Sequence, residues 1–191
     1  MSIHWALKEW QTAVAALLQG KTVLLLRKGG IREGGGQFQV ASRRVLLLPT
    51  FEHQNAQLLK PEFQPLLGAS DRDDADGLVS FCGWAEITHV FPLMPPASAH
   101  KLLPHLVWNQ QFIDDRLGWK PEKPLYCMAL RAYRLASPVP LPRHSGYNGC
   151  RSWVQLGESV NPQGSVPALS EQLYQEQLDA IFTLLPGRVQ V

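Results

Sequence analysis

The stretch Thr22-Val-Leu-Leu-Leu-Arg-Lys-Gly-Gly-Ile-Arg-Glu-Gly-Gly-Gly-Gln-Phe-Gln-Val-Ala-Ser-Arg-Arg-Val-Leu-Leu-Leu-Pro-Thr-Phe-Glu-His53 decides the fold. It holds two uninterrupted apolar runs, residues 23–26 and 45–48, that are short enough to be strands. Because neither run has a polar face, we expect both strands in the interior of a buried sheet. Each run ends in polar residues, and functional groups are often placed on loops at strand ends. We therefore expect these two exits, marked by Lys28 and His53, to open onto one hollow.

The first exit is a glycine-rich, basic segment. Glycines allow positive φ and leave backbone amides accessible, and successive amides in such a turn can bind an anion. The segment lacks the spacing of a phosphate-binding loop and of a dinucleotide-binding fold. Two interpretations stay open, namely contact with phosphate and a hairpin connection with solvated charges. The residues concerned are Arg27, Lys28, Gly29, Gly30 and Arg32.

Composition indicates a soluble globular protein. The 191 residues are 45% hydrophobic and 18% charged, which fits one domain over residues 1–191 with a sizeable core. Residues 1–60 carry eight Lys or Arg against three Asp or Glu. This local surplus favours an anionic partner, with simple solubility as the alternative.

The three cysteines and the N-terminal stretch bear on location. Cys82, Cys127 and Cys150 are far apart and odd in number, which fits a reducing compartment better than a disulfide framework. Lys8 and Glu9 interrupt the region where a signal peptide would be apolar, and no apolar run is long enough to span a membrane. We expect a cytoplasmic protein without a membrane partner.

Hydrophobic periodicity predicts the remaining elements. Residues 79–88 alternate apolar and polar side chains as a half-buried strand, with Gly83 marking a bulge or a close approach. Residues 55–67 contain two prolines and are expected to be an extended segment with at most a short turn of helix. The other predicted elements are an amphipathic helix over 3–19, an exposed acidic loop over 68–77, a helix over 98–118 interrupted by Pro104, a strand over 125–135, an extended proline-rich connection over 137–142, a last strand over 153–156, and a C-terminal helix over about 167–185 capped by Ser165.

Together these elements predict a single α+β domain. We expect a mixed, largely antiparallel curved sheet, or a small open barrel, of about five or six strands flanked by about three helices.

The motifs give little support for catalysis. There is no Gly-x-Ser-x-Gly nucleophile turn, and no Glu is followed two positions later by Lys, as restriction-type nucleases require. His100 and His105 are badly spaced for a shared metal ion. We therefore assign no metal ligands, catalytic residues or cofactor, and whether the protein is an enzyme stays open.

Three strings, in order along the chain, resemble the signature stretches of one bacterial family. That family is common in cyanobacteria and is known as domain of unknown function 1802. The resemblance extends from the first predicted helix to Trp153. Some relatives are joined to restriction-endonuclease-like domains, so the resemblance implies a setting in restriction-modification or related nucleic-acid processing. It assigns no catalytic residue. The strings are Leu25-Leu-Arg-Lys-Gly-Gly-Ile-Arg-Glu33, Leu48-Pro-Thr-Phe-Glu-His-Gln54 and Gly146-Tyr-Asn-Gly-Cys-Arg-Ser-Trp153.

The leading hypothesis is a non-enzymatic domain that binds DNA or RNA or assists its processing. In it, basic side chains contact phosphates and a second group lines a base-sized recess. The phosphate group comprises Arg27, Lys28, Gly29, Gly30, Arg32, Arg43 and Arg44, and the recess group comprises His53, Trp84, Glu86 and Arg151.

Two alternatives remain beside it. One is a magnesium-dependent phosphodiesterase built on Glu33, Glu52 and Glu86, and the other is a protein-interaction module. The sequence leaves the oligomeric state open.

Overall fold

The computed structural model describes residues 1–28, 40–68, 77–149 and 151–185. Most of the glycine-rich exit therefore lies outside the described residues, including the predicted site residues Gly29, Gly30 and Arg32, and so does Glu33. The predicted acidic loop lies outside them as well, except for Gly68 and Gly77 at its ends.

Within these described ranges, seven strands form one mixed, open sheet. Its order is β2-β5-β4-β3-β1-β6, and the short β7 pairs with β5. β1 and β3 are parallel, whereas every other described pair is antiparallel. The α+β class and the largely antiparallel open sheet are thus confirmed. The strands are β1 Ile3–Trp10, β2 Leu24–Lys28, β3 Arg44–Thr50, β4 Leu78–Pro92, β5 Leu125–Pro142, β6 Trp153–Val160 and β7 Val166–Pro167.

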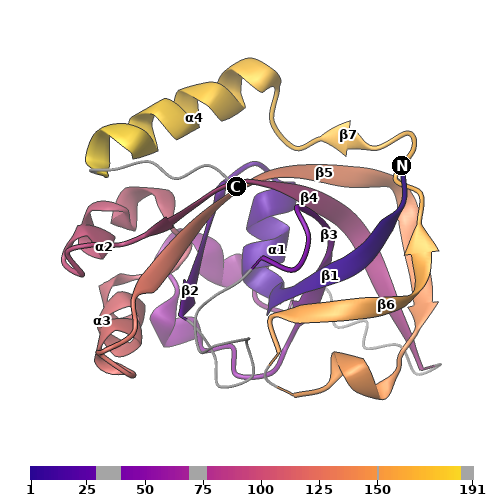
Figure 1. Cartoon of the computed structure of the whole chain (residues 1–191), viewed down its shortest axis with the longest axis horizontal. Helices are drawn as coiled ribbons and strands as arrows, with labels where there is room; N and C mark the ends of the chain where they lie inside the picture. The colour runs from indigo at the N-terminus through magenta and orange to yellow at the C-terminus, as the bar shows by residue number, and fades with distance from the viewer. Residues whose placement is uncertain (29–39, 69–76, 150, 186–191) are drawn as a thin grey trace.

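Short helices surround the sheet, which bends around α1 (Figure 1). Figure 1 also shows α2 and α3 together at one end of the molecule and α4 alongside β5. The α-helices are α1 Gln11–Leu18, α2 Ser98–Lys101, α3 Gln110–Gly118 and α4 Glu171–Leu184. The 3-10 helices are η2 Ala56–Leu58, η3 Pro61–Leu66, η4 Leu103–His105 and η5 Ser145–Tyr147. The prediction of an extended segment over 55–67 is therefore wrong, because η2 and η3 occupy most of it. No helix among these described residues is long and apolar enough to cross a bilayer.

The predicted helix over residues 3–19 is wrong in its first half. Residues 3–10 form β1, which lies between β3 and β6, and only residues 11–18 are helical. Ala6 and Leu7 are both fully buried, in two different apolar clusters. A strand buried on both faces has no polar side, so its apolar residues also fit helical spacing.

The two apolar runs take different places in the sheet. β3 is an interior strand, as expected, whereas β2 ends the described strand order and pairs only with β5. Leu24 and Leu25 are nevertheless fully buried in the main apolar cluster. The apolar residues of β2 are therefore buried by surrounding side chains and not by a second neighbouring strand.

The middle of β4 is a point of close packing. The pairing register with β5 shifts between Phe81 and Gly83, which confirms the predicted bulge. A Cβ placed on Gly83 would lie 2.3 Å from Leu18 Cδ2 and 2.5 Å from the carbonyl oxygen of Tyr133. Only glycine therefore lets α1 approach the sheet this closely.

Three boundaries differ from the sequence prediction. β5 continues through the proline-rich residues 137–142, which pair with the start of β4. The predicted helix over 98–118 is divided into α2, η4 and α3. α4 is capped by Ser170, whose Oγ accepts from Leu173 N at 3.2 Å, while Ser165 hydrogen-bonds elsewhere.

Candidate functional site

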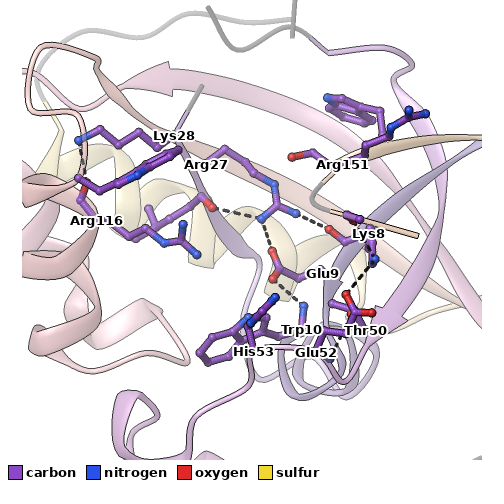
Figure 2. Close-up of a pocket in the computed structure, with 15 residues that line it drawn as sticks. Lys8, Glu9, Trp10, Arg27, Lys28, Thr50, Glu52, His53, Arg116 and Arg151 are labelled. Carbon is purple, nitrogen blue, oxygen red and sulfur yellow. Dashed lines mark hydrogen bonds and ion pairs between the residues drawn. The ribbon is translucent and has the colours of Figure 1, made fainter. Parts of the chain in front are cut away.

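A cleft of about 690 Å³ lies where the ends of several elements meet. The parallel strands β1 and β3 bring their carboxyl ends to it, and the end of β2 lies beside them. The end of α3 forms one wall, and the start of β6 with the turn before it forms the other (Figure 2). The lining residues are Lys8, Glu9, Trp10, Leu26, Arg27, Lys28, Thr50, Glu52, His53, Arg116, Trp119, Gly149, Arg151, Ser152 and Trp153.

A buried ion pair forms the floor of the cleft. Arg27 Nη1 donates to Glu9 Oε2 at 2.5 Å, and the two side chains are only 13% and 4% exposed. Arg27 Nη2 donates to the carbonyl oxygen of Lys8 at 2.8 Å, and the backbone N–H of Trp10 donates to Glu9 Oε1 at 2.7 Å. The guanidinium of Arg27 therefore binds mainly protein groups, which hold β2 against β1.

Lys8 links β1 to the turn before β6 and to the loop after β3. Its Nζ donates to the carbonyl oxygens of Tyr147 at 3.0 Å and Gly149 at 3.1 Å, and lies 3.8 Å from Glu52 Oε2. The turn before β6 and the loop after β3 thus converge on one ammonium group. Lys8 was not a predicted site residue, and a lysine at the end of an unrecognised strand gives no signal in the sequence.

Lys28 fixes the end of α3. Its Nζ donates to the carbonyl oxygens of Arg116 at 2.7 Å and Leu117 at 3.1 Å, in the last turn of the helix. A lysine at this position satisfies terminal carbonyls and complements the helix dipole. Burial lowers the pKa of Lys28, Arg116 adds to that effect, and Glu122 opposes it. Lys28 lines the cleft, but two of its three N–H donors are engaged by α3.

Arg116 and three tryptophans are cleft residues that the sequence analysis missed. The guanidinium of Arg116 lies 4.9 Å from the ring centroid of Phe112. Burial lowers the pKa of Arg116, while the nearby Glu9 opposes this shift and Arg27 adds to it. Arg116 lines the same cleft as the ion pair on the floor. Trp10, Trp119 and Trp153 add indole surface, and Trp119 is 43% exposed.

The loop after β3 is held in an unusual conformation. His53 has φ 62°, a left-handed backbone that non-glycine residues rarely adopt and that clusters at functional sites. The neighbouring Gln54 fixes the loop, because its Oε1 accepts from the N–H of Thr12 at 3.1 Å and from Thr12 Oγ1 at 3.0 Å. His53 itself is exposed and lines the cleft.

The structure therefore brings Arg27, Lys28, His53 and Arg151 to one cleft. The expected meeting of Lys28 and His53 is observed. Whether these residues bind a ligand stays a prediction.

Comparison with known proteins identifies a family. Residues 6–180 match the profile of a family described as Domain of unknown function (DUF1802). The chain belongs to this family. A search of curated proteins finds no match for it.

Three solved structures resemble this DUF1802 chain. They are ASCH from Zymomonas mobilis, with a TM-score of 0.47, and two single-substitution mutants of that protein, with TM-scores of 0.48 and 0.46. Sequence identity is 10% to 11%, and the alignments cover 92% of this chain and 93% to 96% of the others.

Four predicted residues of the DUF1802 chain lie away from the cleft. Glu86 is opposite Arg44 in the β3–β4 register, and their charged groups are 3.7 Å apart. Arg43, beside Arg44, accepts a hydrogen bond from Ile87 N through its carbonyl oxygen. Trp84 stacks on Tyr133 with ring centroids 4.2 Å apart and is 7% exposed.

The predicted recess joining Trp84 and Glu86 to His53 and Arg151 is therefore wrong. Thr50 at the cleft is six positions after Arg44 on β3, a distance of about 20 Å along a strand. The same separation keeps Glu86 apart from Glu52. The two carboxylates thus do not form one magnesium site, and no three metal-binding side chains are grouped elsewhere in the described parts of the chain.

Proposed function

We propose that the cleft binds single-stranded nucleic acid, DNA or RNA, by admitting one nucleotide. The observation that carries this proposal is the combination of cationic and indole side chains around one hollow. Five Lys or Arg and two Glu line the cleft, a surplus of three positive charges. A positive, concave surface concentrates anionic ligands.

The size and lining of the cleft suit a nucleotide. Its volume of about 690 Å³ falls within the usual range for small-ligand sites. Stacking of one base on an aromatic side chain contributes about 1–3 kcal/mol in single-strand-binding proteins and accepts any base. Trp119 and Trp153 offer such surfaces on opposite walls, since one follows α3 and the other begins β6.

The cations of the cleft divide into two groups. Lys8, Arg27 and Lys28 are engaged by protein carbonyls and by Glu9, so they mainly hold the walls in place. Arg151 is exposed at the rim of the cleft. A strand bound there would keep its phosphates in contact with solvent and within reach of this guanidinium. We assign the phosphate contact to Arg151, with His53 beside the same opening.

Fluorescence anisotropy with a labelled 12-nucleotide single strand, as RNA and as DNA, tests the proposal. We expect salt-sensitive binding that Arg151→Glu weakens at least 10-fold, with a salt slope smaller by about 1. Trp119→Ala should weaken binding about 5- to 150-fold, because it removes a stacking surface worth about 1–3 kcal/mol.

Lys21→Glu is the matched control, since Lys21 is exposed and is not a cleft residue. It makes the same change of charge and should leave the affinity within about twofold. The proposal is wrong if neither nucleic acid binds at low salt. It is also wrong if Lys21→Glu and Arg151→Glu weaken binding equally.

A further inference from the structure

The cleft contains one buried carboxylate. Glu52 is at the rim with its side chain 62% exposed, whereas the side chain of Glu9 is 4% exposed on the floor. A carboxylate offers about four acceptor positions. Glu9 uses two of them, for Arg27 Nη1 and for the backbone N–H of Trp10. No other donor among the described residues bonds to this carboxylate, so two positions remain for donors from a ligand.

This placement of charge orients a nucleotide in the cleft. On the floor, Arg27 is already paired with Glu9, whereas Arg151 at the rim is exposed, belongs to none of the ion pairs among the described residues, and attracts a phosphate. The phosphate accordingly stays at the opening and the base points inward. The base then meets an acceptor, Glu9, in a cleft that the cationic donors Arg27 and Arg116 also line (Figure 2).

Guanine has the matching edge among the four common bases. Its N1–H and 2-amino group are adjacent donors, and its O6 acceptor lies next to them. Adenine and cytosine each present one amino donor beside an acceptor, and uracil presents one N–H between two acceptors. A carboxylate can take both guanine donors, and a neighbouring guanidinium can donate to O6.

We propose that the cleft selects guanine, with Glu9 accepting from N1–H and the 2-amino group and Arg116 donating to O6. This inference rests on the proposed function, because it names the base that the nucleic-acid site admits. It makes Glu9 and Arg116 specificity residues, while Arg151 contributes affinity for any nucleotide.

RNA heptamers with three uridines on each side of a central guanine, adenine, cytosine or inosine test the selection. We expect the guanine heptamer to bind at least 10-fold more tightly than the adenine and cytosine heptamers. Inosine lacks the 2-amino group, so its heptamer should bind at least 5-fold more weakly than the guanine one. Glu9→Gln should remove most of the difference between guanine and inosine, because an amide cannot accept both donors.

The outcomes separate this inference from the proposed function. Equal affinity for all four heptamers would overturn guanine selection and leave nucleic-acid binding intact, whereas absence of binding to all four would remove both. Retention of the full preference in Glu9→Gln would overturn the role of Glu9. The comparison of guanine with inosine in the unaltered protein needs no variant, so it decides the matter even if Glu9→Gln fails to fold. Glu86→Gln, a carboxylate away from the cleft, should keep the preference unchanged.

Discussion

At the scale of single residues, the cleft depends on charges that the protein has buried in pairs. Glu9 and Arg27 satisfy one another, and each also bonds to a backbone group of β1. Removal of one partner from a buried pair leaves an unpaired charge, which is more costly than losing both partners together. The pair therefore links β1 to β2, which are not neighbours in the sheet, at the floor of the cleft.

Arg27→Met should lower the free energy of unfolding by about 3–5 kcal/mol, because it leaves the carboxylate of Glu9 buried without its guanidinium. The double variant Glu9→Gln with Arg27→Met should recover part of that loss. Urea denaturation followed by circular dichroism measures all three proteins. A double variant less stable than Arg27→Met would contradict this account.

Tyr174 is a second buried titratable residue. It is 3% exposed, and its hydroxyl lies 2.6 Å from Thr88 Oγ1, which joins α4 to β4. Burial raises the pKa of Tyr174 to about 12, although the hydrogen bond with Thr88 opposes the shift. Because the folded state keeps the proton to higher pH than the unfolded chain, Tyr174 stabilises the fold fully below about pH 10 and loses this contribution as pH rises through about 12.

Tyr174→Phe should therefore flatten the alkaline loss of stability. Between pH 9.5 and 12 the unaltered protein should lose about 2–3 kcal/mol more than the variant does. Urea titrations at several pH values give both curves, and other groups that titrate in this range affect the two proteins alike. Parallel curves would show that Tyr174 is not the residue concerned.

At the scale of elements, close packing of α1 against β4 depends on a missing side chain. Gly83→Ala places a Cβ 2.5 Å from the backbone oxygen of Tyr133, which cannot move aside as a side-chain end can. We expect a loss of about 1–3 kcal/mol, typical of overpacking. Gly157→Ala in β6 is the matched control, since nothing lies within 4 Å of its added Cβ, and it should not destabilise the protein. Equal midpoints of thermal unfolding for the two variants would contradict the close contact.

Some of these elements can be predicted from the sequence and others cannot. β3 and β4 follow from an apolar run and an alternation that are read within a few residues. β1 does not, because β3 and β6 pair with its edges and two different apolar clusters bury its faces, and most of these partners are distant in the chain. The place of β2 at the end of the strand order likewise depends on a distant partner, β5. Strand order depends on pairing partners, which no short window contains.

The cleft residues also fall into those that the sequence predicted and those that it did not. Lys28, His53 and Arg151 were expected because each lies at a strand exit or a turn that the sequence marks. Arg116 was not, because Lys28 places it from 88 residues away in the chain. The separation of Glu86 from the cleft likewise follows from the β3–β4 register, which the sequence does not reveal.

At the scale of the whole molecule, two apolar clusters share one sheet. Leu46 and Leu47 are neighbours on β3, both fully buried, and they belong to different clusters. Successive residues of a strand point to opposite faces, so the clusters lie on the two sides of β3. A sheet that is common to both should make their folding interdependent.

Leu46→Ala and Leu47→Ala should each lower stability by about 2–5 kcal/mol, the usual cost of a cavity in a core. Each should shift one urea transition, with the same midpoint by circular dichroism and by tryptophan fluorescence. A variant that gave two separate transitions would show that the clusters unfold independently, against the expectation of a single domain.

The position of β1 also has a consequence for biosynthesis. β1 is translated well before its partner β6, which emerges about 140 residues later. At about 5–20 residues per second, the ribosome needs roughly 7 to 30 s to supply that partner. Throughout this interval one edge of a strongly apolar strand has no native neighbour, so the nascent chain is a natural client for a chaperone that shields extended segments.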